Sequence, residues 1–326
     1  MATYLVTGGA GFIGSNIATE LVERGETVRV LDNMATGRRE NLAAIEDRIE
    51  FFERDIRDLE AIRPAFKGAD FVLHQAALPS VPRSVKDPVT SNEVNVGGTL
   101  NVLIAARDAE VKRVVFASSS SVYGRNRELP KRESMLQQPI SPYAGSKLAG
   151  ESYLAAFHAV YGLETVALRY FNVFGPRQDP ASQYAAVIPL FITAMMEGRQ
   201  PTIFGDGEQS RDFSYIANVV HANILAANAE GGAGEVFNIA CGRQASLNDL
   251  VRDLNEILGT EIQPIYAEAR VGDVKDSLAD ISRARETLGY EPVVHFREGL
   301  ERAVEWYSAA EPAHSAQDLA PATSRG

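Results

Sequence analysis

The chain has 326 residues, of which 45% are hydrophobic and 23% charged, and this ordinary globular composition excludes a disordered or fibrous protein. A formal net charge of -11 opposes non-specific attraction to nucleic acid or to an anionic membrane, so we expect neither as a partner. The single cysteine, Cys241, excludes an intramolecular disulfide. The histidines show no metal-ligand spacing, so we expect no metal.

The length is greater than one compact domain usually needs, which predicts two lobes that share a cleft. The apolar runs have the length of strands, and none approaches the roughly 20 residues that span a bilayer. No basic segment or cleavage site precedes the first strand, so we expect a cytoplasmic protein.

Strand-like and helix-like segments alternate through the first half of the chain. Ser141 followed by Pro142, and Asp58, are typical helix starts. Such alternation predicts an α/β fold with a doubly wound parallel sheet covered by helices on both faces, closed by the last of these strands. The expected strands are Tyr4–Thr7, Thr27–Leu31, Ile49–Phe52, Phe71–His74, Arg113–Ala117 and Thr165–Arg169, and the expected helices are 12–24, 58–66, 88–109 and 142–161, with a loop after the second strand.

After Gly175-Pro176 the sequence changes to pieces separated by proline and glycine, which predicts a smaller α/β lobe. We assign 1–175 to the sheet domain, expect 212–240 to rejoin it, and assign 176–211 and 241–309 to the smaller lobe. The tail 310–326 lacks apolar periodicity and is expected to be disordered. The elements expected here are the strand Thr202–Phe204 and helices at 185–198, 216–228, 246–258, 281–288 and 297–308.

A glycine-rich loop joins the first strand to the first helix. Gly8 suits a tight turn, Gly11 a close approach of the backbone to a pyrophosphate, and Gly14 close packing of helix on strand. Asp32 ends the second strand, where a carboxylate accepts hydrogen bonds from an adenosine ribose. Loop and carboxylate together predict a Rossmann dinucleotide site.

Asp32 favours NAD over NADP, because a 2′-phosphate there would meet a like charge. Two charges about 4 Å apart repel by roughly 4 kcal/mol at an effective dielectric of about 20. Arg38 and Arg39 favour the opposite reading, since an arginine near that position can receive the phosphate. We expect NAD.

Tyr143 is the only tyrosine with a lysine four residues later, Lys147, and on a helix this spacing places both on one face. A tyrosine base near neutrality needs its pKa lowered by about three units, and one cation about 5 Å away supplies roughly that. Lys147 is the expected activator, helped by the positive charge of oxidised nicotinamide. At the end of the fifth strand, Ser118 to Ser121 offer hydroxyls to a reacting oxygen, and the sequence leaves open which one is used.

These segments together resemble the extended short-chain dehydrogenase/reductase superfamily, specifically the UDP-hexose 4-epimerases, from about residue 3 to about 308. The resemblance implies that Ser119, Tyr143 and Lys147 are catalytic and that a homodimer forms through helices 88–109 and 142–161. The cofactor-binding residues it implies are Gly8, Gly11, Phe12, Ile13, Gly14, Asp32, Asn33, Asp55, Ile56, Ala76, Asn95, Tyr143 and Lys147.

The resemblance also implies a UDP-sugar site in which two arginines clamp the diphosphate and Asp273 faces the uridine ribose. Dehydratase relatives carry an Asp-Glu pair, and decarboxylase relatives a Glu, where this chain has Ser120 and Ser121. Without that acid, a redox-neutral 4-epimerase is the expected activity. The implied substrate-binding residues are Ser80, Arg83, Ser119, Ser120, Asn172, Val187, Arg211, Arg270, Asp273 and Ser277.

The family's gate position, a tyrosine in members limited to UDP-glucose and UDP-galactose, is the small Ser277 here. We therefore favour UDP-GlcNAc and UDP-GalNAc as substrates, with UDP-glucose and UDP-galactose as further candidates. UDP-glucuronate is the alternative, because Arg83 or a serine can receive a carboxylate. Two further alternatives are a non-catalytic NAD-binding sensor or scaffold and a one-way reductase that releases its cofactor at every turnover.

Overall fold

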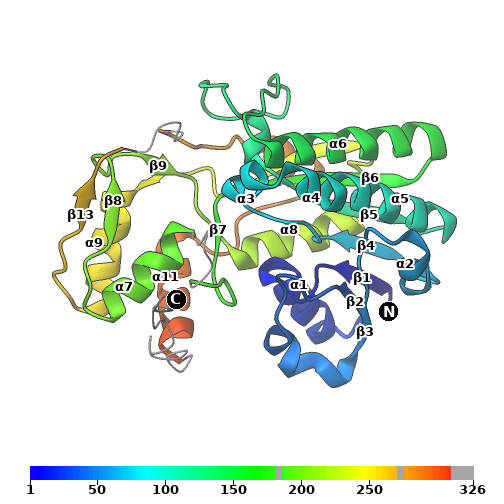
Figure 1. The fold of residues 1–326 in the computed structure, drawn as a ribbon, viewed down its shortest axis with the longest axis horizontal. Coiled ribbons are helices and arrows are strands. Elements are labelled where there is room, and N and C mark those ends of the chain that lie inside the picture. Colours follow the sequence, from blue (N-terminus) through cyan, green and yellow to red (C-terminus); the bar gives the residue numbers. More distant parts are fainter. Residues whose placement is uncertain (181–185, 270–274, 310–326) are drawn as a thin grey trace, which may run out of the picture.

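The computed structural model describes residues 1–180, 186–269 and 275–309. Its centre is a seven-stranded sheet, to the right in Figure 1, in which all neighbouring strands are parallel. The strand order is β11-β6-β5-β4-β1-β2-β3. The strands are β1 (Thr3–Thr7), β2 (Thr27–Asp32), β3 (Ile49–Glu53), β4 (Phe71–His74), β5 (Arg113–Ser119), β6 (Glu164–Tyr170) and β11 (Glu235–Ile239).

Helices cover both faces of this sheet, because each strand that is buried on two sides needs an apolar cover on each. One buried cluster joins the sheet to α1 (Phe12–Glu23) and α8 (Ile216–Asn228). The other joins it to α2 (Leu59–Phe66), α5 (Gly98–Asp108) and α6 (Pro142–Tyr161). The predicted doubly wound Rossmann sheet is confirmed.

The expected helix starts are confirmed by side-chain caps. The Ser141 hydroxyl accepts a hydrogen bond from the Ala144 amide before α6, and the Asp58 carboxylate accepts one from Ala61 before α2. These bonds satisfy backbone donors that a helix otherwise leaves unpaired in its first turn.

Three expectations about the elements need correction. Thr165–Arg169 does not close the sheet, because β11 returns from the second half of the chain and pairs along β6. The loop expected after the second strand contains a 3-10 helix, Arg39–Arg48, which buries Leu42 and Ile45. The helix expected at 88–109 consists of α4 (Pro88–Asn92), a π turn at Glu93–Gly97 and α5.

The smaller lobe lies to the left in Figure 1. Its predicted strand, Thr202–Phe204, is present with the predicted bounds, and the ends of its predicted helices differ by at most two residues. The assignment of 212–240 to the sheet domain stays a prediction, supported by α8 and β11. The lobe and its connections contain β7 (Val173–Phe174), α7 (Val187–Met196), β8 (Thr202–Phe204), β9 (Ser210–Arg211), β10 (Ser214–Tyr215), β12 (Ala245–Ser246), α9 (Leu247–Leu258), β13 (Ile265–Ala267), α10 (Ser282–Leu288) and α11 (Phe296–Ala309), with the short α3 (Val81–Lys86) preceding α4.

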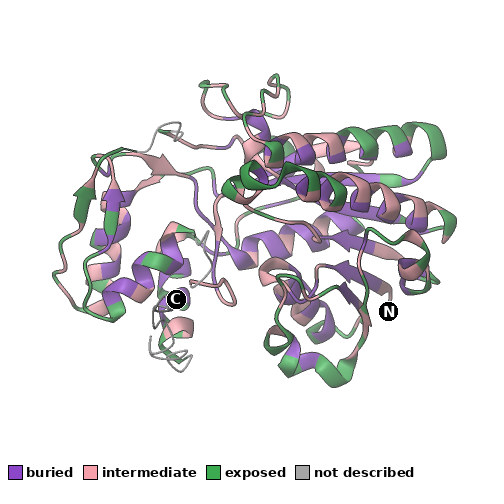
Figure 2. Ribbon diagram, in the orientation of Figure 1, coloured by how far each residue is buried: buried purple, intermediate pink, exposed green. Residues whose placement is uncertain are grey.

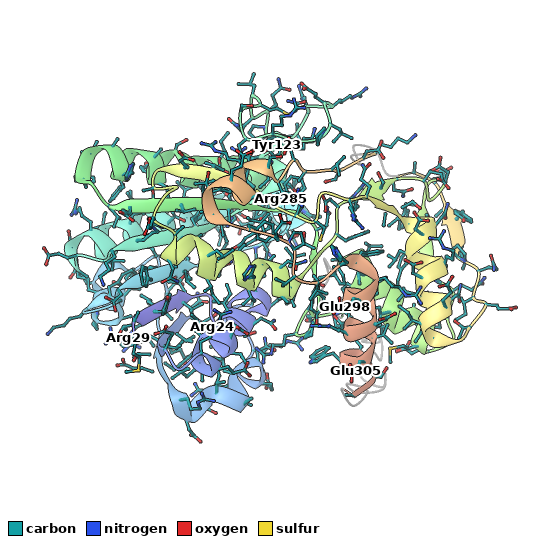
Figure 3. All side chains as sticks on the ribbon, turned by 180° about the vertical axis from the view of Figure 1, so that it is seen from behind. Arg24, Arg29, Tyr123, Arg285, Glu298 and Glu305 are labelled. Atoms are coloured by element: carbon teal, nitrogen blue, oxygen red, sulfur yellow. The ribbon has the colours of Figure 1, made fainter. Side chains whose placement is uncertain are left out.

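Buried residues follow the strands and the inner sides of the helices (Figure 2). Charged side chains such as Arg24, just after α1, and Glu298 and Glu305 on α11 lie on the surface (Figure 3). Within the described ranges no helix combines the length and apolarity needed to cross a membrane. The same residues contain no cluster of histidine, cysteine and acidic side chains that could hold a metal. The predicted tail 310–326 lies outside the described residues.

Candidate active site

The glycine loop has the close backbone contacts that its sequence predicts. Gly8 has a φ of 67°, and a Cβ there would lie 2.6 Å from the Ala76 nitrogen. A Cβ on Gly14 would lie 2.2 Å from the Gly8 carbonyl oxygen, so helix α1 packs directly on the turn. Gly11 begins α1 without a side-chain cap, as suits a helix whose first amides face a pyrophosphate. Gly9 was not predicted, but its Cβ would overlap Val30.

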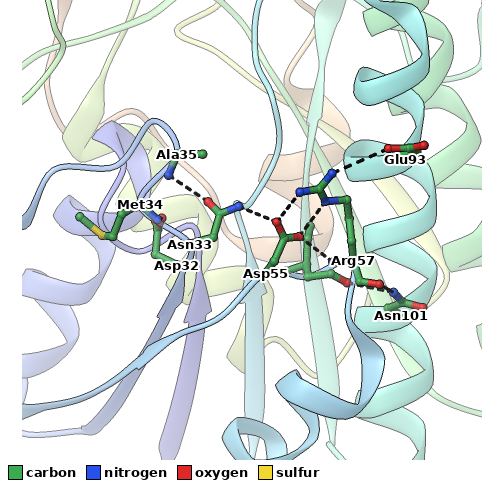
Figure 4. A network of polar contacts seen from close by, with 9 residues as sticks. Asp32, Asn33, Met34, Ala35, Asp55, Arg57, Glu93 and Asn101 are labelled. Atoms are coloured by element: carbon green, nitrogen blue, oxygen red, sulfur yellow. Dashed lines mark hydrogen bonds and ion pairs between the residues drawn. The ribbon is translucent and has the colours of Figure 1, made fainter.

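Asp32 lies 7% exposed at the end of β2, beside this loop. Its carboxylate accepts hydrogen bonds from the amides of Ala10 (3.0 Å) and Met34 (2.8 Å), which keep it in place, while burial raises its pKa. Asn33 donates to Asp55 at 2.8 Å, as Figure 4 shows. The predicted cofactor residues Asp32, Asn33 and Asp55 therefore lie together at the ends of β2 and β3.

Asp55 also pairs with Arg57, whose guanidinium holds the pKa of this carboxyl at about 2 (Figure 4). The next residue, Ile56, is buried against Gly98 of α5. Phe12 and Ile13 lie half-buried in the first turn of α1. The predicted adenosine side of the site is thus assembled from α1, β2 and the segment after β3.

The two arginines that argued for NADP each hold a carboxylate. Arg38 forms an ion pair with Asp179 at 2.5 Å, and Arg39 forms one with Glu46 at 2.8 Å. With both guanidiniums paired and Asp32 at the predicted ribose position, the described residues fit NAD.

The catalytic residues predicted from sequence come together at the carboxyl end of β5. Lys147 is 3% exposed, and its Nζ donates to the Ala117 carbonyl at 2.8 Å and lies 5.9 Å from the centre of the Tyr143 ring. Ser119 ends β5, close enough to Tyr143 for its hydroxyl to lower the pKa of the phenol. Strand β5 and helix α6 position all three residues.

The pKa values in this group have opposing causes. Burial raises the pKa of the Tyr143 phenol, and the hydrogen bond with Ser119 opposes this rise. Burial lowers the pKa of Lys147 to about 8, while the Glu151 carboxylate raises it. The protein's own groups therefore do not produce the expected lowering of the Tyr143 pKa, because burial raises this pKa more than the Ser119 hydroxyl lowers it.

Two further hydrogen bonds orient the first turn of α6. The Tyr143 amide donates to the Ser84 hydroxyl at 3.0 Å, which ties α3 to α6. Asn95, in the π turn, donates a hydrogen bond to the Ser146 hydroxyl at 3.0 Å. Its side chain also accepts a hydrogen bond from the Leu78 amide and donates one to the Leu78 carbonyl. Asn95 was predicted, but Ser84 was not, because no local pattern relates it to a residue 59 positions away.

His74 occupies the buried end of β4, between the hydroxyls of Thr7 (2.7 Å) and Thr99 (3.0 Å). Burial, helped by the charge of Lys147, lowers its pKa from 6.5 to about 3. The unfolded chain therefore binds a proton below pH 6.5 that the folded chain does not bind until about pH 3, so stability falls as the pH falls through this window.

We expect a loss of about 2 kcal/mol in the free energy of unfolding from this histidine between about pH 7.5 and pH 5. Urea unfolding of His74→Asn should therefore show a weaker pH dependence than the wild type over that interval. His295→Gln, at an exposed position, is the matched control and should keep the wild-type slope. Equal slopes for His74→Asn and the wild type would refute this assignment.

The neighbouring serines differ in their contacts. The Ser119 hydroxyl accepts a hydrogen bond from the Ser121 amide at 3.2 Å. The Ser121 hydroxyl is buried and has no hydrogen-bond partner among the described residues. Ser120 lies half-buried in the 3-10 turn Ser120–Tyr123.

A cavity of about 300 Å³ lies in the smaller lobe, beside the segment that follows β6. Three of the predicted substrate residues, Asn172, Val187 and Arg211, line it. Asn172 has a φ of 35° and donates to the Asp212 carbonyl, and Arg211 donates to the carbonyls of Ser210 and Lys275. Phe204 and Phe213 add aromatic walls that were not predicted.

The remaining predicted substrate residues lie elsewhere. Ser80 caps α3 by accepting from the Arg83 amide, and neither residue is among those that line the cavity. Ser277 donates its amide to Ser210, and it too is not among the lining residues described. Arg270 and Asp273 lie outside the described residues.

Residues 4–240 match the NAD dependent epimerase/dehydratase family. The chain belongs to this family. It is accordingly an enzyme, and its cofactor is NAD, as the glycine loop and Asp32 predict.

Members of the family with known names or structures are similar to this chain along nearly all of its length. A UDP-glucose 4-epimerase of Mycolicibacterium smegmatis is 41% identical over 308 residues, covering 93% of this chain and 97% of that one. The structure of a UDP-N-acetylglucosamine 4-epimerase from Methanobrevibacter ruminantium M1, in complex with UDP-N-acetylmuramic acid, has 43% identity and a TM-score of 0.90, covering 94% and 98%. A Thermus thermophilus UDP-glucose 4-epimerase in complex with NAD has 38% identity and a TM-score of 0.85, covering 94% and 99%.

Proposed function

We propose that this family member is a UDP-hexose 4-epimerase that interconverts UDP-GlcNAc and UDP-GalNAc, with UDP-glucose and UDP-galactose as further substrates. The observation that carries the proposal is the grouping of Ser119, Tyr143 and Lys147 at the end of β5, in a chain that also holds the dinucleotide loop. The named epimerases above support it, because they match nearly the full chain.

Bound NAD supplies a hydride acceptor and donor for C4 of the sugar. Tyr143 takes the proton of the 4-hydroxyl and later returns it, and Ser119 holds the same oxygen by a hydrogen bond. Burial raises the Tyr143 pKa, and the Lys147 ammonium is fixed on the Ala117 carbonyl. By Coulomb's law we expect this ammonium, together with the positive charge of oxidised nicotinamide, to oppose the rise. The proton transfer thus depends on positive charge close to the phenol.

The UDP moiety is proposed to occupy the cavity beside Asn172 and Arg211. The chain has a net charge of -11, so a diphosphate needs a local cation. Arg211, with Arg270, can bind its oxygens bidentately, and Asp273 is proposed to bind the ribose. Tight binding of UDP with loose binding of the hexose lets the 4-keto sugar rotate and present its other face to the cofactor.

Ser120 and Ser121 support epimerisation over dehydration. Hydroxyls occupy the two positions at which dehydratase relatives carry acids, so no carboxyl is present there to drive loss of water. The return of hydride to C4 is then the remaining outcome.

The substrate is tested by incubating the purified protein, without added NAD, separately with UDP-GlcNAc, UDP-glucose and UDP-glucuronate, and reading the products by NMR. We expect UDP-GalNAc to form fastest, because the small Ser277 leaves room for an N-acetyl group. UDP-galacturonate as the main product would instead support the alternative, in which Arg83 or a serine receives the carboxylate. A product that forms only with added NADH, in proportion to the NADH consumed, would support a one-way reductase, and no product in any arm would support a non-catalytic sensor.

We also propose a homodimer that forms through the helices around 88–109 and 142–161. Exposed apolar side chains support this surface, namely Val89 on α4 and Tyr153, Val160 and Tyr161 on α6. Sedimentation equilibrium should give twice the chain mass. A charged substitution at Val160 should shift it toward the monomer.

A further inference from the structure

Glu151 and Arg169 form an ion pair buried beneath the catalytic residues. Their side chains are 6% and 3% exposed, respectively. The guanidinium binds the carboxylate with two parallel hydrogen bonds, from Nε at 2.9 Å and from Nη2 at 2.7 Å. The Ser118 hydroxyl donates to the same carboxylate. Removing two charges from water is costly, and a hydrophobic pair would often be equally stable, so the pair calls for an explanation.

The partners come from the three elements that meet at the catalytic site. Ser118 on β5 lies in register with Arg169 on β6, one residue before the catalytic Ser119. Glu151 lies one helical turn beyond Lys147 on α6. The pair therefore ties α6 to the ends of both strands at the level where Lys147 and Ser119 must face Tyr143.

The pair also sets the charge around Lys147. Arg169 balances Glu151, so the remaining net charge in this group is the lysine ammonium. Burial lowers the pKa of Lys147, and the Glu151 carboxylate counteracts this effect. Three other titratable side chains lie near the group. Burial keeps His74 on β4 neutral, and the Tyr123 ring lies 4.8 Å from the Arg169 guanidinium. Burial raises the pKa of Glu133, and the charge of Arg169 opposes this rise.

We propose that Glu151 and Arg169 are positioning residues of the catalytic site: their ion pair holds α6 against the ends of β5 and β6, and the Glu151 carboxylate cancels the buried Arg169 charge that would otherwise favour loss of the Lys147 proton beside Tyr143. The inference rests on the proposed function. If the active enzyme needs an ionised Tyr143 and a protonated Lys147, the acid limb of its pH profile reports the tyrosine and the alkaline limb the lysine.

The test is the pH profile of kcat for the wild type, Glu151→Gln and Glu151→Gln/Arg169→Gln. Glu151→Gln leaves the buried cations Lys147 and Arg169 without the carboxylate. The uncompensated positive charge should lower the pKa of both Lys147 and Tyr143, so both limbs should move to lower pH. For charges about 6 Å apart at an effective dielectric of about 20, the shift is about one to two pH units. The double variant removes both charges, so both limbs should return to their wild-type positions even if kcat is lower.

Ionisation of Tyr143 can also be measured without turnover. For each protein the tyrosinate absorbance is recorded against pH, and the absorbance of the same protein carrying Tyr143→Phe is subtracted. The midpoint of this difference should shift in parallel with the limbs of the pH profile. A lower kcat in Glu151→Gln with unmoved limbs would mean a purely structural pair and overturn the inference. If Glu151→Gln does not fold, Arg169→Gln provides the converse test, because it removes the positive charge of the pair and leaves the carboxylate. Both limbs of its pH profile should move to higher pH, and unmoved limbs would again overturn the inference. A wild-type protein that epimerises no UDP-sugar would refute the proposed function instead.

Discussion

Tyr143→Phe is expected to lower kcat by about a hundredfold to ten-thousandfold, the range typical of a removed general acid-base group. The substitution deletes one oxygen from a half-buried side chain whose position is set by helix α6 and by the hydrogen bond that the Tyr143 amide donates to the Ser84 hydroxyl. The ring and its neighbours remain, so the variant should fold and keep its NAD. Stopped-flow and steady-state assays with UDP-GlcNAc, together with NAD content, measure the effect.

Tyr153→Phe is the matched control, because Tyr153 lies on the same helix and is exposed. It should retain wild-type kcat. Wild-type turnover in Tyr143→Phe would remove the proposed base, and with it the mechanism. Loss of NAD together with loss of turnover would instead show that the phenol contributes to cofactor binding.

Gly14→Ala is expected to yield a protein that retains little NAD. The added Cβ would lie 2.2 Å from the Gly8 carbonyl oxygen and 2.8 Å from the Gly9 Cα. Both are backbone atoms, so either α1 or the loop must move. Overpacking of this kind costs about 1–3 kcal/mol in stability, and displacement of the loop should weaken NAD binding at least about tenfold. NAD content after purification and the affinity for added NAD measure the effect.

Gly97→Ala provides the control, because a Cβ at that helical position meets no atom within 4 Å. It should keep a full complement of NAD. If Gly14→Ala also retained all its NAD, the close contact of α1 with the turn would have no bearing on the cofactor.

Much of this site could be predicted because its signals are local. The glycines of the loop, Asp32 at the end of β2, and Tyr143 one turn before Lys147 are each defined within one strand-helix unit. Parallel strands place their carboxyl ends at one edge, so the meeting of these units follows from the alternation of elements. The substrate residues Asn172, Val187 and Arg211 were placed by resemblance, and the cavity brings these three together.

The sequence by itself determined the α/β class, the nucleotide loop, the choice of NAD and the tyrosine-lysine pair, because periodicity and short spacings encode them. Only the tertiary structure placed β11 beside β6 and formed the hydrogen bond between the Tyr143 amide and Ser84. It alone also formed the ion pair of Arg38 with Asp179 and the buried ion pair of Glu151 with Arg169. These contacts join residues that are distant in the chain, and their energies depend on burial and charge balance. No local pattern carries that information, so the pKa of Tyr143 could be judged only in the folded protein.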